Sequence, residues 1–297
     1  MWKAYTVALT LLAALADASV VVSIPDLKNI VERIYDGEVE CIAPSNVDPH
    51  LFSLTSRDLQ KAKEAKLLVL ANSGILEFEE RLKDLATEVL DFEDYEAEIL
   101  SFPGIGENYH AYWLLPENAM RIASKVKEKL SEIYPEKKEV YEQNFLAFKA
   151  SLEIAKRDAE KIVENVKDRD YIAMDPHTAY AISALNLSIS FAFPEDVAPS
   201  ALELRNLSSK SCVVAIAEYQ RGTKIEEMAL KIANEKGCGI AVLKVISDLT
   251  PESMLIYNAA ILSNLEEGEK GENVLLHILA LVAVAEAVAI VVLWRLK

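Results

Sequence analysis

Short apolar runs alternate with amphipathic helical patterns along most of this chain, and one long stretch interrupts the alternation. The interruption covers about 116–168, where no strand pattern occurs. Such alternation is typical of parallel sheets covered by helices. The sequence therefore predicts an α/β fold class with two parallel-sheet lobes. Predicted strands are 20–24, 39–43, 67–71, 97–101, 171–174, 188–193, 212–217 and 239–246, and predicted helices include 26–35, 76–86, 200–208, 224–235 and 251–265.

Two prolines organise the interruption. Pro116 suits the first turn of a helix, and Pro135 divides the stretch into two helices. The second helix, 136–167, is too long for an ordinary crossover, and we interpret it as one long helix joining the lobes. A coiled coil is the alternative, but the large apolar residues show no sustained heptad. The predicted domains are an N-terminal lobe (19–135), the connecting helix (136–167) and a C-terminal lobe (168–267).

Both ends of the chain carry membrane signals. Residues 1–18 combine Lys3, an apolar stretch and a small-x-small site before Ser19, the pattern of a secretory signal peptide. Residues 273–294 are almost entirely apolar and long enough to cross a bilayer as a transmembrane helix. Arg295 and Lys297 follow, so the positive-inside rule predicts a single-pass membrane protein with a cytoplasmic C-terminus and an extracytoplasmic ectodomain. Residues 268–272 would be a short tether.

Charge and cysteine content narrow the function. The net charge of −16 argues against nucleic acid as a partner, because phosphate binding needs a basic surface. No Gly-x-Gly-x-x-Gly follows a predicted strand, which disfavours dinucleotide binding. Cys212 and Cys238 lie near the starts of consecutive predicted strands. They could form a disulfide in an oxidising compartment, although two small buried thiols are the favoured alternative.

Three of the four histidines follow predicted strands. The tripeptide Asp-Pro-His occurs twice, ending at His50 and at His177, once in each half of the chain. His110 follows the run 97–101, whereas His277 lies at the edge of the predicted membrane span and is interpreted as unrelated. Ligand groups in open α/β sheets gather beyond the carboxyl ends of strands. The pattern predicts a metal ion held between the lobes, and the alternative is that these are ordinary solvated loop histidines.

A carboxylate would complete such a site, and two follow strands of the second half. Asp248 comes after the run 241–246, and Glu218 directly follows 213–217. Asp248 could instead cap the next helix. Asp48 and Asp175 could accept hydrogen bonds from ligand histidines or could simply be turn residues before proline.

Several of these motifs together resemble a known family, the zinc/manganese solute-binding proteins of metal ABC importers (the TroA-like group, cluster A-I). The resemblance covers nearly all of 19–267. The motifs are Ser-Asn-Val-Asp-Pro-His at 45–50 with Thr-Ser-Arg-Asp at 55–58, Trp-Leu-Leu-Pro-Glu-Asn-Ala at 113–119 after His110, the helix opened by His177, Ala-Pro-Ser at 198–200, and 217–220 through Ser247-Asp248.

The resemblance implies two α/β lobes joined by one long helix, with a metal in the cleft. The implied ligands are the residues matching His50, His110, His177 and Asp248, with Glu218 as the reserve. The chain departs from the family in placing two residues between His110 and Trp113, where members usually have one. It also lacks the histidine-rich acidic loop of many zinc-type members, since 91–107 contains no histidine.

We therefore expect a binding protein, not an enzyme. It would capture a divalent transition metal outside the cell and deliver it to an ABC permease, with Zn²⁺ favoured over Mn²⁺ as the bound substrate. The ectodomain is expected to be a monomer anchored by its C-terminal helix. The alternatives are a secreted, membrane-anchored zinc hydrolase with Glu218 as general base, and a metal buffer or adhesin without a permease. The absence of His-Glu-x-x-His disfavours the hydrolase.

Overall fold

A computed structural model of the chain describes residues 20–45, 49–194, 212–246 and 249–265. Its N-terminal lobe is built on a parallel sheet with the strand order β2-β1-β3-β4. The central strands β1 and β3 are fully buried apolar runs, as expected when helices cover both faces of a parallel sheet. The strands are β1 (Val20–Val22), β2 (Val39–Cys41), β3 (Leu67–Val69) and β4 (Val89–Leu90).

The helices of this lobe begin where local chemistry favours a helix start. Thr55 caps α2, because its hydroxyl accepts from the Asp58 N–H while the Asp58 carboxylate accepts from the Thr55 N–H. Pro25 and Pro116 each begin a helix at a position where no amide proton is needed. The helices are α1 (Pro25–Val31), α2 (Ser56–Glu64), α3 (Glu77–Lys83) and α4 (Pro116–Ile133).

The C-terminal lobe repeats this plan. Its parallel sheet has the order β10-β9-β7-β8, with β7 (Asp170–Ala173), β8 (Ile189–Ala192), β9 (Cys212–Ala217) and β10 (Gly239–Leu243). Its helices are α6 (Pro176–Ser183), α8 (Lys224–Lys236) and α9 (Pro251–Ser263). The helix predicted at 200–208 lies outside the described residues.

A disulfide joins Cys212, at the start of β9, to Cys238, just before β10. The parallel register places Val213 beside Gly239, so the two cysteines are neighbours across the sheet. The favoured interpretation of two buried thiols was therefore wrong, and the disulfide alternative is the one observed.

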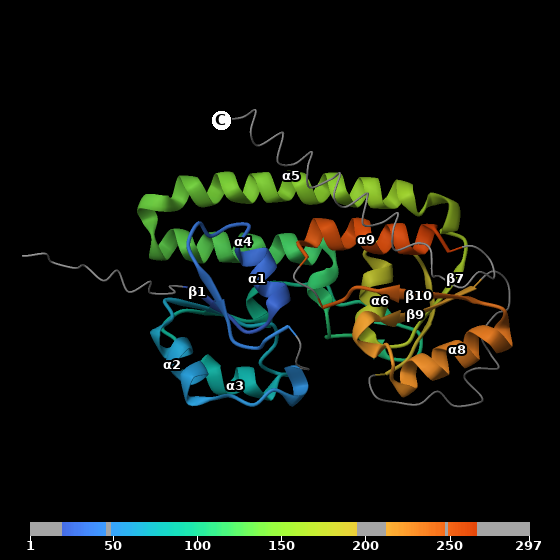
Figure 1. The fold of residues 1–297 in the computed structure, drawn as a ribbon. Coiled ribbons are helices and arrows are strands. Elements are labelled where there is room, and N and C mark those ends of the chain that lie inside the picture. Colours follow the sequence, from blue (N-terminus) through green and yellow to red (C-terminus); the bar gives the residue numbers. More distant parts are fainter. Residues whose placement is uncertain (1–19, 46–48, 195–211, 247–248, 266–297) are drawn as a thin grey trace, which may run out of the picture.

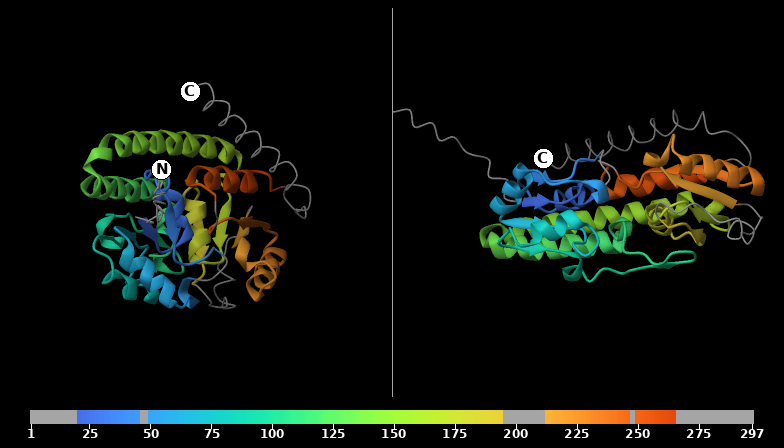
Figure 2. Two further views of the ribbon diagram at one scale, coloured as in Figure 1. Left: turned by 60° about the vertical axis from the view of Figure 1, so that its left-hand side comes forward. Right: turned by 90° about the horizontal axis from the view of Figure 1, so that it is seen from below.

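The long helix α5 (Lys138–Ile162) spans both lobes on the side away from α2, α3 and α8 (Figures 1 and 2). It packs on α4 of the first lobe and α9 of the second. The 3-10 turn η4 (Pro135–Lys137) separates it from α4, as Pro135 predicts, and η5 (Glu164–Val166) ends it. Its buried side chains are Tyr141, Phe148, Leu152, Ala155 and Ala159.

The strand predicted at 97–101 is wrong. The fourth strand of the first sheet is β4, and 97–100 has no regular structure. The chain instead forms a small antiparallel hairpin, β5 (Ser101–Phe102) and β6 (Gly106–Glu107). This hairpin contacts the C-terminal lobe, where the Ala192 N–H donates to the Pro103 carbonyl at 2.8 Å. Gly104 has φ +102°, and a Cβ there would lie 2.2 Å from the Ala192 carbonyl oxygen, so glycine is required for this approach.

None of the helices in the described ranges is both long and apolar enough to cross a membrane. The signal peptide predicted at 1–18, the tether at 268–272 and the transmembrane helix at 273–294 all lie outside those ranges.

The packing of α5 leads to a stability prediction. Leu152→Ala should lower the free energy of unfolding by about 2–5 kcal/mol, because Leu152 is fully buried and its loss leaves a cavity. The matched control is Leu146→Ala on the same helix, where the side chain is 48% exposed and the change should stay within about 0.5 kcal/mol. Urea unfolding of the two variants measures both values. Equal losses of unfolding free energy in the two variants would mean that burial of the inner face of α5 does not stabilise the fold.

Candidate metal-binding site

Three histidines reach the same region of the molecule from different elements. His50 lies in the 3-10 turn η1 (Pro49–Leu51) beyond β2 and is exposed. His110 lies in the loop after β6 and is partly buried. His177 occupies the first turn of α6, directly beyond β7, and is only 8% exposed. The structure thus confirms that His50 and His177 follow parallel strands, whereas His110 follows the hairpin.

The three imidazoles line one cleft between the lobes, with a volume of roughly 480 Å³. The ring centres of His50 and His110 are 5.3 Å apart, and those of His110 and His177 are 6.0 Å apart. Two imidazoles bound to one tetrahedral zinc ion have ring centres about 5 Å apart, given Zn–N bonds of about 2.0–2.1 Å. The spacing therefore suits a shared ion after a small further approach. As they stand, no three His, Cys, Asp or Glu side chains within the described ranges form a closed ligand set.

The electrostatics keep His110 in the form that binds metal. Burial lowers the pKa of His110, and the nearby His50 lowers it further, while the charge of Asp175 partly opposes both. A lowered pKa leaves the imidazole neutral at pH 7, and only a neutral nitrogen can donate its lone pair to a metal.

Tyr219 packs against the His177 ring, and Asp175 holds Tyr219 in place. The Asp175 carboxylate accepts the Thr178 N–H at 2.7 Å and so caps α6. Its other oxygen accepts the Tyr219 hydroxyl at 3.0 Å, and the Tyr219 ring meets the His177 ring edge-on at 6.2 Å. Asp175 is therefore a helix cap that also holds an aromatic wall of the cleft. Asp48 lies outside the described residues.

The two candidate carboxylates differ in what the structure describes of them. Asp248 lies outside the described residues. Glu218, in the 3-10 turn η6 (Glu218–Gln220), lines the cleft and forms an ion pair with Lys244 at 2.8 Å. Lys244 is also 5.4 Å from the centre of the Tyr257 ring. One carboxylate oxygen of Glu218 is therefore already paired with Lys244.

A buried carboxyl group supports the wall of the cleft formed by Ala71 and Asn72. Both oxygens of Glu79 accept backbone N–H groups, from Ala71 at 2.9 Å and from Asn72 at 2.7 Å. The Ser23 hydroxyl oxygen accepts the same Ala71 N–H at 3.2 Å. Burial raises the pKa of Glu79 to about 7 despite these bonds. The turn after β3 is thus held by an acid that is partly protonated near neutrality.

Sequence reasoning overlooked Glu79 and Tyr219 as residues that support the walls of the cleft. A signal existed for Glu79, which lies three residues from both Leu76 and Leu82 and so falls on the apolar face of α3. Tyr219 carries no such signal, because its partners Asp175 and His177 are distant in sequence.

Comparison with known proteins decides the family. The profile described as "ZnuA: Zinc-uptake complex component A periplasmic" matches residues 20–267. The chain belongs to this family. The two-lobe fold expected from the resemblance is that of the family's solved structures, and members are binding proteins for zinc uptake, not enzymes.

Individual relatives agree with this assignment. The high-affinity zinc uptake system protein ZnuA of Haemophilus ducreyi is 28% identical over 74% of this chain and 83% of its own length. The zinc-binding lipoprotein AdcA of Streptococcus pneumoniae is 24% identical over 72% of this chain, which spans about half of that longer protein.

Solved structures show the same fold. A ZnuA deletion mutant with zinc bound superposes with a TM-score of 0.68 at 26% identity, covering 84% of this chain and 98% of the other. A manganese-bound periplasmic metal-binding protein of Candidatus Liberibacter asiaticus also gives 0.68, at 17% identity, over 82% of this chain and 98% of the other.

The buried Glu79 leads to a prediction on pH. A carboxyl group whose pKa rises from about 4.5 to about 7 on folding binds more protons in the folded state between these values. The free energy of unfolding should therefore fall as pH rises from about 4.5 to 7, by up to about 3 kcal/mol, and then level off. The measurement is urea unfolding of metal-free protein against pH, taken as the difference between wild type and Glu79→Gln so that other groups cancel. A difference that does not change with pH would contradict the raised pKa.

Proposed function

We propose that the protein binds Zn²⁺ outside the cytoplasm through His50, His110, His177 and Asp248, and delivers it to an ABC permease. The observation that carries the proposal is the convergence of three imidazoles, from both halves of the chain, on one interlobe cleft. An ion held there would contact both lobes at once. Membership of the zinc-uptake family agrees with this role.

The donor set bears on which metal is bound. Three nitrogens and one carboxylate oxygen suit a four-coordinate zinc ion. Manganese prefers more oxygen ligands, and intrinsic affinity also favours zinc. We therefore favour Zn²⁺ over Mn²⁺ as the substrate, although a fold relative binds manganese.

The two other functions have less support. A hydrolase would need Glu218 as a free general base beside the metal, but its carboxylate is engaged by Lys244. A metal buffer or adhesin would use the same cleft without a permease. Zinc-limited growth and ⁶⁵Zn uptake of cells lacking the protein distinguish that function from transport.

The membrane topology completes the proposal. Residues 1–18 would direct export, 268–272 would be the tether, and 273–294 would anchor the protein in the membrane with its C-terminus in the cytoplasm. Tethering raises the effective concentration of the protein near the permease.

The three histidines give the first functional prediction. His50→Ala, His110→Ala and His177→Ala should each weaken zinc binding by about tenfold or more, because losing one metal–nitrogen bond costs more than the about 1.4 kcal/mol of a tenfold change. Competition titration against a zinc chelator measures the affinity. The matched control is His277→Ala, the fourth histidine, which should bind like wild type. A triple variant of the cleft histidines with unchanged affinity would rule out the site.

The two candidate carboxylates, Asp248 and Glu218, give the second functional prediction. Asp248→Ala should lower zinc affinity more than Glu218→Ala, since Glu218 already has Lys244 as its partner. Lys244→Met serves as the control, because it frees Glu218 without altering either carboxylate. If Glu218→Ala is the more harmful change, the fourth ligand is Glu218.

A further inference from the structure

Asn108 connects two of the histidines through both ends of its side chain. It lies between β6 and His110 and is only 2% exposed. Its Oδ1 accepts the backbone N–H of His110 at 3.0 Å, and its Nδ2 donates to the carbonyl oxygen of Pro176 at 2.8 Å. Pro176 directly precedes His177 in the first turn of α6. The Asn108 carboxamide therefore bonds both to the backbone of His110 and to the backbone of the residue that precedes His177.

The backbone of Asn108 is bound to the same helix. Its carbonyl oxygen accepts the hydroxyl of Tyr180 at 2.7 Å, and that hydroxyl oxygen accepts the N–H of Leu100 at 3.0 Å. Tyr180 is fully buried, lies one turn beyond His177, and packs edge-on against Phe102 of the hairpin at 5.4 Å. The His110 loop is thus bonded to α6 at two places, at Pro176 in the first turn and at Tyr180 one turn later.

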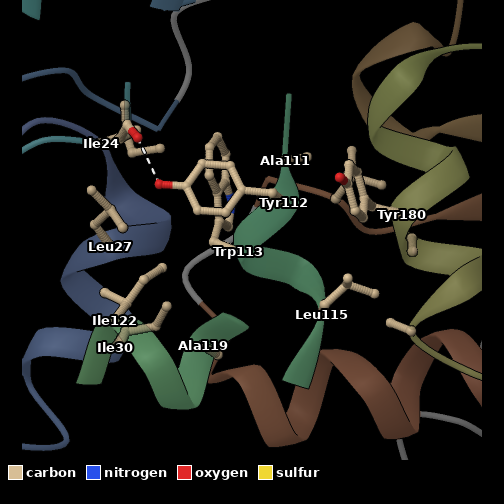
Figure 3. Packing of buried hydrophobic residues seen from close by; sticks show 14 of the residues in the cluster. Ile24, Leu27, Ile30, Ala111, Tyr112, Trp113, Leu115, Ala119, Ile122 and Tyr180 are labelled. Atoms are coloured by element: carbon tan, nitrogen blue, oxygen red, sulfur yellow. Dashed lines mark hydrogen bonds between the residues drawn. The ribbon is translucent and has the colours of Figure 1, made fainter. Parts of the chain in front are cut away.

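On its other side the His110 loop is joined to the turn after β3, within its own lobe. The Tyr112 hydroxyl donates to the carbonyl oxygen of Ala71 at 2.6 Å. Figure 3 shows Tyr112 and Trp113 between α1, with Leu27, and α6, with Tyr180. Ala111, between these two anchors, has φ +53°, a backbone conformation that is unfavourable for a residue with a Cβ. The bonds of Asn108 and Tyr112 hold the loop in this conformation, with His110 between them.

We propose that Asn108 is a positioning residue that fixes His110 relative to His177, so that these two imidazoles, one from each lobe, form a ready-made pair to which His50 of the N-terminal lobe is added. This inference rests on the proposed function, because it assumes that the histidines bind the metal. Only a carboxamide suits this position: aspartate keeps the acceptor for His110 but loses the donor to Pro176, and leucine loses both. Groups that orient metal ligands without touching the metal commonly change affinity by about 10- to 100-fold.

The test is Asn108→Asp in the full-length protein. Zinc affinity should fall about tenfold, although the added negative charge alone would strengthen cation binding. The absorption bands of the Co²⁺-loaded protein should also change in position or intensity, because they report the arrangement of ligands around the ion. A role limited to stability would lower the unfolding midpoint and leave both readouts unchanged.

Asn144→Asp is the matched control. Asn144 on α5 also donates its Nδ2 to a backbone carbonyl, that of Ile34 at 2.9 Å, but this carbonyl is not next to a cleft histidine. It should match wild type in zinc affinity and cobalt spectrum. Wild-type affinity and spectrum in Asn108→Asp would overturn the proposal.

Tyr180→Phe provides a second variant in case Asn108→Asp does not fold. It removes the hydroxyl that holds the Asn108 carbonyl, and it should weaken zinc binding in the same direction but less. Unchanged affinity in Tyr180→Phe would then overturn the proposal. Absence of zinc binding by the wild-type protein itself would instead disprove the proposed function, so the two failures are distinguishable.

Discussion

Parallel strand pairing is the constraint on which the site depends. Every strand of β2-β1-β3-β4 runs in one direction, and the same holds for β10-β9-β7-β8. The chain therefore leaves each sheet repeatedly at one edge, and the residues that follow the strands gather there. Ile24, Pro44, Ala71, His177, Glu218 and Val245 all line the interlobe cleft, and all lie just beyond the ends of strands. The cleft follows from the strand direction, before any particular ligand is considered.

The features that could be predicted from the sequence are those with a local cause. Apolar runs predict every strand of the two parallel sheets except β4, and Pro135 predicts the break before α5. The repeated Asp-Pro-His gave two of the cleft histidines, because each copy follows a strand. These signals need only neighbours in sequence.

The features that were missed depend on contacts between distant residues. The two-residue strand β4 is too short to show a pattern, so the apolar run at 97–101 was assigned in its place. Only Ser101, the last residue of that run, lies in a strand, and this strand is part of the hairpin whose Gly104 approaches Ala192 of the other lobe. Asn108 resembles any polar loop residue until Pro176 and Tyr180 are placed beside it. Residues that support a site through their backbone partners leave no spacing rule in the sequence.

The disulfide between Cys212 and Cys238 has a consequence for the release of cargo. It joins the first residue of β9 to the residue before β10, at the edge of the sheet opposite the cleft. Closing a loop of this length stabilises a folded chain by about 3–4 kcal/mol in the chain-entropy account. Proteins whose metal site supplies their folding energy unfold when the ion leaves. In the proposed site, the ion would bind at the ends of these strands that lie opposite the covalent link, so the C-terminal lobe would stay folded after giving up its ion and could capture another.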